Sequence, residues 1–254
     1  MLHIEQLCFS YGDTPVFRDL TLRIRCDAIT TLLGANGCGK TTLLQLLTKN
    51  LKPDSGRIAL EGTDLADIPL RELARKAAIV HQKNAAPDDL TVERLVGYGR
   101  LPYTSILRTG LDGENQVQVD RALELTDLDG LRDRRLGTLS GGQRQRAFIA
   151  MALAQSTGLL FLDEPTTFLD VRYQVEVLRL IERLSREQGI TIVMVLHDIN
   201  QALCYSDEVI GLRGGCVAVQ GAPEEVINSE SIRQLYGIEL PVYRAEGRLC
   251  VMSV

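Results

Sequence analysis

Three apolar segments constrain the fold of this chain more than any other feature. They span residues 29–33, 159–162 and 190–196, and none shows the alternation of polar and apolar residues that a half-exposed strand has. Such segments are typical of parallel strands that are covered on both faces. Glycine or polar residues follow each one directly. Because ligands bind at the carboxyl ends of the strands in open α/β sheets, the three endings predict one common site.

Composition narrows the class of protein further. With 254 residues, 45% of them hydrophobic, the chain can bury a sizeable core, and disorder is excluded. The balance of 28 basic against 33 acidic residues gives a net charge of −5, which provides no general attraction to nucleic acid. Six scattered cysteines without CxxC spacing fit a reducing compartment and argue against a zinc site. No apolar run approaches the roughly 18 to 20 residues of a membrane span, and no secretion signal is expected.

Weaker patterns surround the three buried segments. Partly alternating runs predict an antiparallel flank with strands at residues 2–11, 17–25 and 56–61. Helical spacing of apolar residues predicts an insertion at 91–100 and 112–125, interrupted by a stretch with proline and glycine at 101–113. Beyond residue 221 we expect one helix over 224–236, followed by a hairpin of 241–244 and 248–252.

The first chemical motif follows the apolar segment that ends at Leu33. Residues 34–41 read GANGCGKT, which fits the pattern GxxxxGK[ST], and a helical run comes next. Glycines let successive backbone N–H groups face a phosphate, Lys40 adds a positive charge, and the Thr41 hydroxyl can ligate Mg²⁺. The alternative is a glycine turn that only caps a helix. The predicted nucleotide ligands here are Gly34, Asn36, Gly37, Cys38, Gly39, Lys40, Thr41 and Thr42.

Two adjacent carboxylates, Asp163 and Glu164, close the second apolar segment. Such a pair at the end of a buried strand is unfavourable unless it meets cations or water, and a Mg²⁺-nucleotide supplies that partner. We expect Asp163 to hold Mg²⁺ through water and Glu164 to polarise the attacking water as general base. Taken alone, the pair also fits an ordinary polar loop after a core strand.

A third motif, Ser140-Gly141-Gly142-Gln143, begins a strongly helical run. Ser140 stands where an N-cap residue belongs, and the free amides at the positive end of the helix form a second anion site. The same residues also serve as a plain helix cap in many proteins. Because one loop already accounts for the phosphates, the residues alone leave the role of this second site open.

Taken in order, these motifs resemble the nucleotide-binding subunits of ATP-binding cassette (ABC) transporters. The resemblance is carried by GANGCGKT at 34–41, LSGGQRQR at 139–146 and LLFLDEPT at 159–166, and it covers nearly the whole chain. It implies an α/β fold of the ABC ATPase type: a P-loop NTPase core with a parallel sheet, an antiparallel β flank and an inserted helical subdomain. It also implies an ATPase that uses ATP and Mg²⁺.

The same resemblance assigns four further residues. It implies that Tyr11 stacks on adenine and that Gln82 serves both Mg²⁺ and the loop that couples to the transporter. It also implies that Asp170 lies in a subunit-contact loop and that His197 meets the γ phosphate. Each of these residue types is singly more common in a structural setting, but their order and spacing favour the functional interpretation. The predicted catalytic residues are thus Gln82, Glu164 and His197, and the predicted Mg²⁺ ligands are Thr41, Gln82 and Asp163.

Partners and location follow from the resemblance as well. Two copies are expected to pack head to tail around two nucleotides, so that Ser140 and Gly142 of one copy contact the ATP held by Lys40 of the other. Transmembrane permease subunits and, indirectly, an extracytoplasmic substrate-binding protein are implied, and nucleic acid is not. The expected location is peripheral, on the cytoplasmic face of the inner (cell) membrane.

The segment VGYGRLPY at 96–103 narrows the type of transporter. It is similar to a stretch in importer ATPases for ferric siderophores, ferric citrate, haem and vitamin B12. This chain has Ala35, Thr41 and Phe168 at positions where other residues are usual in the family. These differences remove no catalytic group. We therefore predict the ATP-hydrolysing subunit of an importer for ferric chelates or related metal complexes. Alternatives are another cargo, an exporter, or a soluble cassette that acts in assembly or on nucleic acid.

The motifs also suggest how one ABC ATPase domain is divided over residues 1–254. We place the nucleotide-binding core at 1–87 and 137–220, the helical subdomain at 88–136, and a C-terminal helix and hairpin at 221–254.

Overall fold

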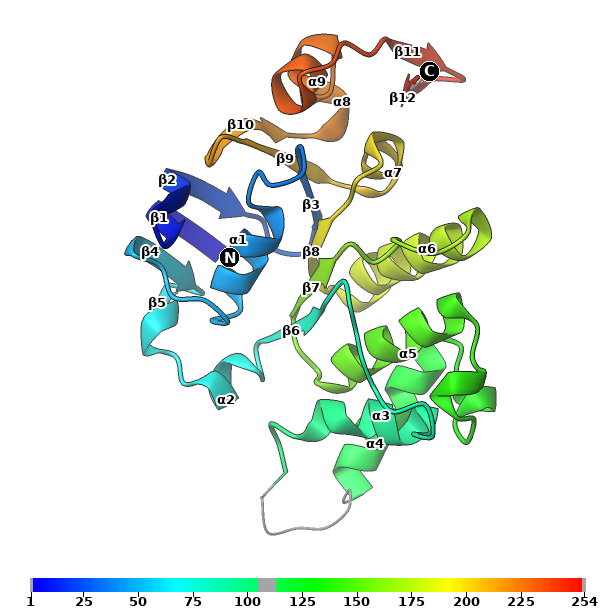
Figure 1. The fold of residues 1–254 in the computed structure, drawn as a ribbon. Coiled ribbons are helices and arrows are strands. Elements are labelled where there is room, and N and C mark those ends of the chain that lie inside the picture. Colours follow the sequence, from blue (N-terminus) through cyan, green and yellow to red (C-terminus); the bar gives the residue numbers. More distant parts are fainter. Residues whose placement is uncertain (1, 105–112, 253–254) are drawn as a thin grey trace. The chain divides into compact units, whose positions relative to one another are not determined.

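A computed structural model describes residues 2–104 and 113–252 (Figure 1). Backbone contacts divide it into two compact units. Unit 1 comprises the residues up to Ile68 together with those from Thr191 onward, and unit 2 comprises Pro69–Ile190. Within the described residues, no helix is long and apolar enough to span a membrane. The predicted proline- and glycine-bearing stretch falls mostly on residues 105–112, outside the described part.

Parallel strands form the centre of unit 1. β3 (Ile29–Leu33) pairs in parallel with β8 (Thr191–Val195) on one side and with β9 (Glu208–Arg213) on the other. β10 (Cys216–Gly221) continues the sheet antiparallel to β9. Every residue of β3 and β8 is buried, which explains why these segments are apolar without alternation. The prediction of parallel strands is confirmed here, and α1 (Lys40–Leu47) follows β3 across the glycine-rich loop.

The predicted antiparallel flank is confirmed as a sheet with the strand order β2-β1-β4-β5. The first two strands of the chain alternate in burial, as expected for a sheet with one exposed face. Leu2 of β1 lies opposite both Ile24 of β2 and Leu60 of β4, so the core face of the three strands is in register. The strands are β1 (Leu2–Tyr11), β2 (Thr14–Ile24), β4 (Ser55–Leu60) and β5 (Thr63–Asp64), with the short η1 (Leu65–Asp67) after them.

The C-terminal part of unit 1 differs from the sequence prediction in one respect. The single helix expected over 224–236 is wrong, because Asn228 starts a new helix there. Its side chain accepts a hydrogen bond from the Ser231 amide at 2.9 Å and thereby caps the second helix. The two helices are α8 (Pro223–Val226) and α9 (Ser229–Tyr236). The predicted hairpin is present as β11 (Val242–Ala245) and β12 (Arg248–Val251), and α7 (Ile199–Tyr205) lies earlier in the chain.

Unit 2 contains two parallel strands and most of the helices. β6 (Ala77–Val80) pairs with β7 (Leu159–Asp163), the second predicted apolar segment. Two helices that contact each other confirm the predicted helical runs of the insertion: α3 (Val92–Gly97) and α4 (Gly113–Leu125). α5 (Gly141–Ala154), which follows the insertion, contacts both of them. α6 (Val171–Gln188), an amphipathic helix with one buried face, was not predicted. The short helices are α2 (Leu70–Leu73), η2 (Tyr98–Arg100), η3 (Asp129–Leu131) and η4 (Leu136–Thr138).

The importer-like segment 96–103 has a structural role in unit 2. Arg100 is only 4% exposed and donates to Asn115 Oδ1 at 2.8 Å and to the Ala154 carbonyl at 2.6 Å. Its guanidinium lies 3.9 Å from the ring centroid of Tyr103, and Arg75 lies 5.0 Å from the same ring. Two cations therefore flank one aromatic ring, an arrangement in which burial strengthens the cation–π attraction.

Candidate nucleotide-binding site

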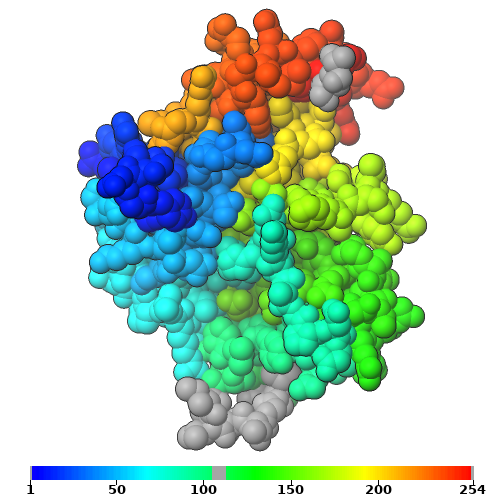
Figure 2. Space-filling view, in the orientation of Figure 1, coloured from blue at the N-terminus to red at the C-terminus, as the bar shows by residue number. Residues whose placement is uncertain are grey.

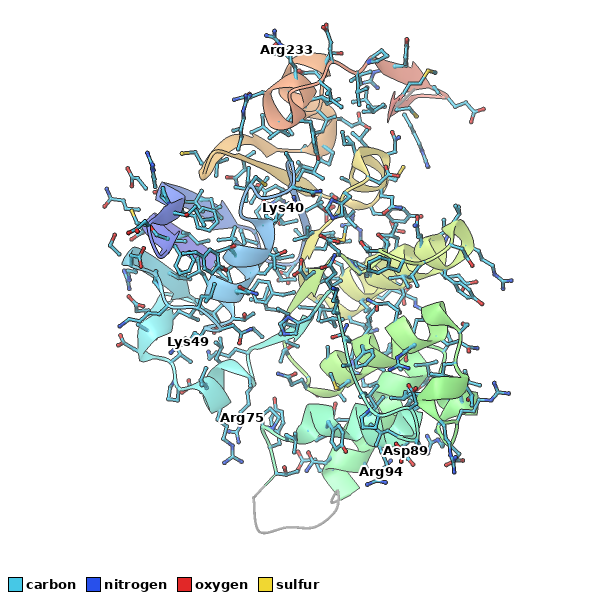
Figure 3. The ribbon with its side chains drawn as sticks, in the orientation of Figure 1. Lys40, Lys49, Arg75, Asp89, Arg94 and Arg233 are labelled. Atoms are coloured by element: carbon cyan, nitrogen blue, oxygen red, sulfur yellow. The ribbon has the colours of Figure 1, made fainter. Side chains whose placement is uncertain are left out.

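Lys40 lies across its own glycine-rich loop at the start of α1 (Figure 3). Its Nζ donates to the carbonyl oxygens of Gly34 at 2.7 Å and Ala35 at 3.1 Å, and it approaches Cys38 Sγ at 3.8 Å. The side chain is 6% exposed, so these contacts compensate a buried ammonium. The loop carbonyls thus accept hydrogen bonds from the ammonium group, and phosphate oxygens can take their place.

Two glycines of this loop leave no room for a side chain. Gly34 has a φ of +141°, and a Cβ there would lie 2.3 Å from the carbonyl oxygen of Leu212. Gly39 has a φ of +106°, and a Cβ there would lie 2.7 Å from the ring of Phe17. Gly39 is also the N-cap of α1, and no side chain caps the helix there. The uncapped N–H groups at the positive end of α1 are therefore suited to an anion.

Two more predicted residues belong to unit 1. Tyr11 is 50% exposed, packs edge-on against Phe9 with ring centroids 4.9 Å apart, and donates to Gln45 Oε1 at 3.2 Å. His197 is exposed and follows β8, and the next residue, Asp198, caps α7. The ring of Tyr11 is therefore not buried in the core, which was the structural alternative for this residue.

In unit 2 the structure joins two predicted catalytic residues that lie 82 positions apart in the sequence. Gln82 Nε2 donates to Glu164 Oε2 at 2.5 Å, and Thr167 Oγ1 donates to the same oxygen at 3.0 Å. Glu164 itself has a left-handed backbone with a φ of +53°, a conformation that is strained for a residue with a side chain. Asp163 is the last residue of β7 and is 5% exposed. The sequence analysis did not single out Thr167, although this residue lies between the predicted site residues Glu164 and Asp170.

The Ser140 motif forms a complete capping box at the start of α5. The Gln143 amide donates to Ser140 Oγ at 3.3 Å, and Gln143 Oε1 accepts from the Ser140 amide at 3.0 Å. Gly142 packs so closely on Tyr173 that a Cβ would lie 2.3 Å from its ring. Asp170 caps α6 by accepting from the Tyr173 amide at 3.0 Å. Tyr173, which the sequence did not single out, therefore joins Gly142 to Asp170.

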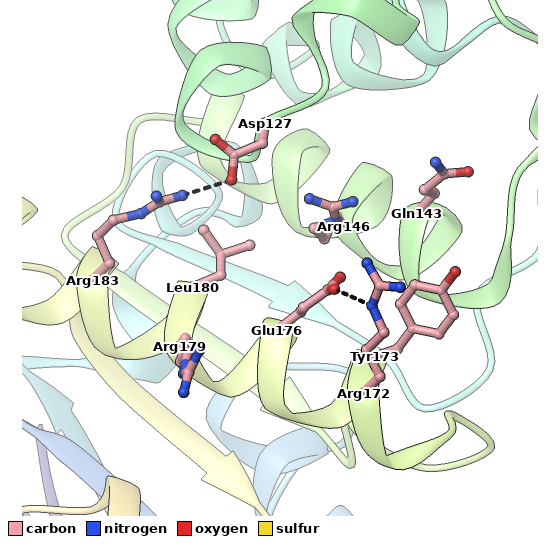
Figure 4. Close-up of a pocket in the computed structure, with 9 residues that line it drawn as sticks. All are labelled: Asp127, Gln143, Arg146, Arg172, Tyr173, Glu176, Arg179, Leu180 and Arg183. Atoms are coloured by element: carbon pink, nitrogen blue, oxygen red, sulfur yellow. Dashed lines mark hydrogen bonds and ion pairs between the residues drawn. The ribbon is translucent and has the colours of Figure 1, made fainter.

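A pocket of about 480 Å³ lies beside these residues, lined by four arginines among others (Figure 4). Arg183 Nη2 donates to the Leu125 carbonyl at 2.7 Å and to Asp127 Oδ2 at 3.1 Å. Arg146 Nη1 donates to the Thr126 carbonyl at 3.4 Å. Cations at the last carbonyls of a helix interact favourably with its negative end. These two arginines therefore stabilise the C-terminal end of α4, which has no basic residue of its own in the last turn.

The predicted ligands fit the groups they are meant to hold. The loop 34–41 offers backbone amides, one ammonium and one hydroxyl, which is the donor set of a phosphate site. Thr41, Gln82 and Asp163 offer oxygen atoms, which are the ligands that Mg²⁺ prefers. The loop, Tyr11 and His197 lie in unit 1, whereas Gln82, Asp163, Glu164, Ser140, Gly141, Gly142, Gln143 and Asp170 lie in unit 2.

A buried parallel strand, a glycine-rich loop and a lysine at the first position of the next helix define a P-loop nucleotide-binding protein. Residues 17–167 match the model of the ABC transporter family. The ferric enterobactin transport ATP-binding protein FepC of Escherichia coli (strain K12) is 42% identical over 234 residues, 92% of this chain and 86% of that protein.

Two solved structures agree with this match. One, reported as a metal-chelate type ABC transporter in an inward-facing conformation, is 27% identical with a TM-score of 0.85 and covers 99% of this chain and 97% of that chain. The other, a dimeric bacterial ABC transporter cassette, is 27% identical with a TM-score of 0.74 and covers 88% of this chain and 99% of that chain. The chain belongs to the ABC transporter family, and its activity is ATP hydrolysis coupled to transport.

Proposed function

We propose that this chain is the ATP-hydrolysing subunit of an importer for ferric chelates or closely related metal complexes. The observation that carries the proposal is the likeness along 92% of the chain to a protein for ferric enterobactin transport, at 42% identity. The structural likeness to a transporter of metal-chelate type supports the same cargo class. The segment 96–103, which suggested this class from the sequence, is tied to the ends of α4 and α5 through Arg100.

The phosphates of ATP bind to the loop 34–41 in this proposal. Lys40 exchanges the carbonyl oxygens of Gly34 and Ala35 for phosphate oxygens, and the amides of Asn36, Gly37 and Gly39 turn to the same anion. The Cys38 amide, which donates to the Ala35 carbonyl at 3.2 Å, exchanges that carbonyl for a phosphate oxygen as well. Thr41, with Thr42 beside it, supplies the hydroxyl for Mg²⁺, which neutralises phosphate charge when it is bound. Tyr11 presents an exposed ring on which adenine stacks.

Hydrolysis requires a base that activates water. We assign this role to Glu164, whose carboxylate Gln82 and Thr167 orient through hydrogen bonds to Oε2. Asp163 and Gln82 hold Mg²⁺, and His197 contacts the γ phosphate. A carboxylate held from two sides is restricted to one rotamer, which favours a fixed distance to the attacking water.

A second copy of the chain completes the site in this proposal. Ser140, Gly141, Gly142 and Gln143 of one copy face the nucleotide of the other, and Asp170 lies in the contact loop between them. Two apolar side chains flank Asp170 in exposed positions: Phe168 is 84% exposed and Val171 is 75% exposed. Burial of such side chains against a second copy is favourable, at about 25 cal/mol per Å². The dimeric cassette among the solved relatives supports this arrangement.

The remaining partners are membrane components. We infer that the chain associates peripherally with permease subunits on the cytoplasmic face of the cell membrane and acts indirectly on an extracytoplasmic substrate-binding protein. The subdomain that we assign to residues 88–136, which contains α3 and α4, provides the surface for the permease, and nucleic acid is not a partner.

Two substitutions test the site. Lys40→Ala removes the phosphate charge partner and should abolish most MgATP binding in calorimetry, whereas Lys52→Ala, which removes an exposed lysine, should leave it unchanged. Glu164→Gln keeps the shape of the side chain but removes the base, so hydrolysis should fall at least about a hundredfold. The same variant should be a dimer with ATP and a monomer with ADP. Unchanged affinity in the first case, or surviving activity in the second, contradicts the assignments.

The cargo requires the whole transporter. Reconstituted with its permease and binding protein, the complex should take up a ferric siderophore in an ATP-dependent manner. Uptake of an unrelated cargo, or efflux of the ferric chelate, would contradict import of this class.

A further inference from the structure

The C-terminal extension, which we define as residues 223–251, contacts the nucleotide site of unit 1 at two places. It contains α8, α9 and the β11–β12 hairpin. In Figure 2 its orange and red residues lie directly against the yellow segment that contains α7. The sequence suggested no chemistry for this part of the chain, so these contacts call for a physical explanation.

The first contact joins the extension to the phosphate loop. The amide N–H of Gly34 donates to the hydroxyl oxygen of Tyr236 at 3.3 Å. The carbonyl of the same Gly34 accepts from Lys40 Nζ at 2.7 Å. Both polar groups of the first loop residue are therefore engaged, one by the extension and the other by the lysine of the loop. Because Gly34 also packs against the Leu212 carbonyl, its backbone has little freedom to move.

Tyr236 is held firmly enough to act in this way. It is the last residue of α9, whose Ile232 and Leu235 are buried, and Gly237 ends the helix in a left-handed conformation. Arg233 lies on the exposed face of the same helix (Figure 3). Burial raises the pKa of the Tyr236 hydroxyl to about 12; the hydrogen bond from the Gly34 amide acts against this shift, and the nearby Cys38 and Asp198 add to it. The phenol therefore stays neutral, and its oxygen remains an acceptor for an amide.

The second contact joins the extension to the helix that follows His197. Asn200 Nδ2 donates to the Val251 carbonyl at 2.9 Å, and the Val251 amide donates to Asn200 Oδ1 at 2.8 Å. One side chain thereby satisfies both backbone groups of a hairpin residue. Since Asp198 caps the helix that carries Asn200, the hairpin is anchored three residues beyond His197.

We propose that Tyr236 is a positioning residue for ATP binding, because its hydroxyl fixes the Gly34 peptide and so keeps the phosphate loop in its binding conformation before ATP arrives. The inference rests on the proposed function, in which residues 34–41 bind the phosphates. A loop that is ordered in advance loses less conformational freedom when the ligand binds, and this raises affinity without any contact to the ligand. Tyr236 thus acts through Gly34 and need not touch ATP.

Tyr236→Phe is the direct test, since it keeps the ring and removes only the hydroxyl. A lost neutral hydrogen bond corresponds to about a threefold to tenfold weaker affinity for MgATP. We expect Kd from calorimetry and KM from steady-state hydrolysis to rise by this factor. At saturating ATP the nucleotide itself orders the loop, so kcat should be unchanged. Tyr243→Phe is the matched control, because this tyrosine lies in the same extension and is 51% exposed.

A purely structural role for Tyr236 predicts a different result. In that case Tyr236→Phe has a lower melting temperature in the absence of nucleotide, but its Kd and KM equal those of Tyr243→Phe. This outcome overturns the proposal. A second measurement uses the unaltered protein. With isotope-labelled glycine, the Gly34 amide should exchange slowly with solvent in the nucleotide-free state, and rapid exchange refutes the proposal even if the variant does not fold.

The Lys40→Ala variant separates this proposal from the one it rests on. If Lys40→Ala binds MgATP normally, the assignment of the phosphate loop fails. If Lys40→Ala loses binding while Tyr236→Phe keeps the affinity of the wild type, the loop assignment holds and only the role of Tyr236 is refuted.

Discussion

Gly142 is expected to contribute to the stability of unit 2 before any contact with a second copy is made. A Cβ at this position would lie 2.3 Å from Cδ1 and 2.5 Å from Cγ of Tyr173, far inside van der Waals distance. Overpacking of this kind costs about 1–3 kcal/mol. Against it stands the preference of a helix for Ala over Gly, about 0.5–1 kcal/mol. We therefore expect Gly142→Ala to lower the free energy of unfolding by about 1–2 kcal/mol.

The cost of this substitution should shrink when the tyrosine is shortened. Tyr173→Ala removes the ring but keeps the backbone amide that Asp170 accepts from, so the N-cap of α6 survives. The two closest ring atoms are then gone, while the Cβ of residue 173 still lies 2.9 Å from the added Cβ. Gly142→Ala should therefore destabilise the protein less in that background than in the presence of the ring. Gly141→Ala is the control, since its Cβ would meet only Leu169 Cδ2, at an ordinary distance of 3.4 Å.

Urea unfolding followed by far-ultraviolet circular dichroism gives the four free energies of this double-mutant cycle. If Gly142→Ala is equally destabilising with and without the Tyr173 ring, the steric explanation is refuted. Hydrolysis is a separate measurement: activity that stays low in the double variant, although the ring no longer clashes, indicates a second role of Gly142 at the nucleotide of a partner copy.

Three further predictions follow from the same structure. Arg100→Ala should destabilise the protein by about 1–3 kcal/mol in urea unfolding, because the buried Asn115 Oδ1 and the Ala154 carbonyl lose a donor, and Arg100→Lys should not restore stability because an ammonium cannot replace the planar fork. The pKa of Tyr236 is raised from 10.0 to about 12 in the folded state, so the neutral phenol is favoured there. The stability that this group contributes is fully present below the lower of these values and is lost as the pH rises through the higher one. Tyr236→Phe should therefore abolish the last step of a tyrosinate absorbance titration. Thiol reagents should inactivate hydrolysis through Cys38, with MgATP slowing the reaction. Cys38→Ser should resist them, and inactivation at the parent rate would place the sensitive thiol elsewhere.

The fold was predictable where local chemistry decides the outcome. β3, β7 and β8 are apolar throughout because both faces are covered, and that is visible in the sequence without any partner strand. The break between α8 and α9 was missed although its signal is present. Asn-Ser-Glu at residues 228–230 is a helix start, and the apolar spacing on both sides concealed it.

The supporting residues of the site were harder to predict. Tyr173, Thr167 and Tyr236 act through Gly142, Glu164 and Gly34, and the last of these pairs lies 202 positions apart. A tyrosine or threonine carries no local mark of such a contact, because the partner is chosen by tertiary packing. The phosphate loop differs in this respect. Its glycines are required by their own backbone angles and by the close approach of Leu212 and Phe17, so the pattern is readable from a single stretch of sequence.

The backbone of Glu164 has a consequence for anyone who engineers this protein for heat resistance. A residue with a Cβ in the left-handed conformation is strained by about 1 kcal/mol, and glycine at position 164 relieves that strain. Glycine also gives up the hydrogen bonds from Gln82 and Thr167, at about 1 kcal/mol each, so the exchange brings no net gain in stability. The same two hydrogen bonds that orient the carboxylate for water activation therefore offset the strain of its backbone. A screen that selects only for survival at high temperature should not enrich Glu164→Gly in the parent, whereas in a background without Gln82 and Thr167 the strain is no longer offset and glycine becomes the more stable residue.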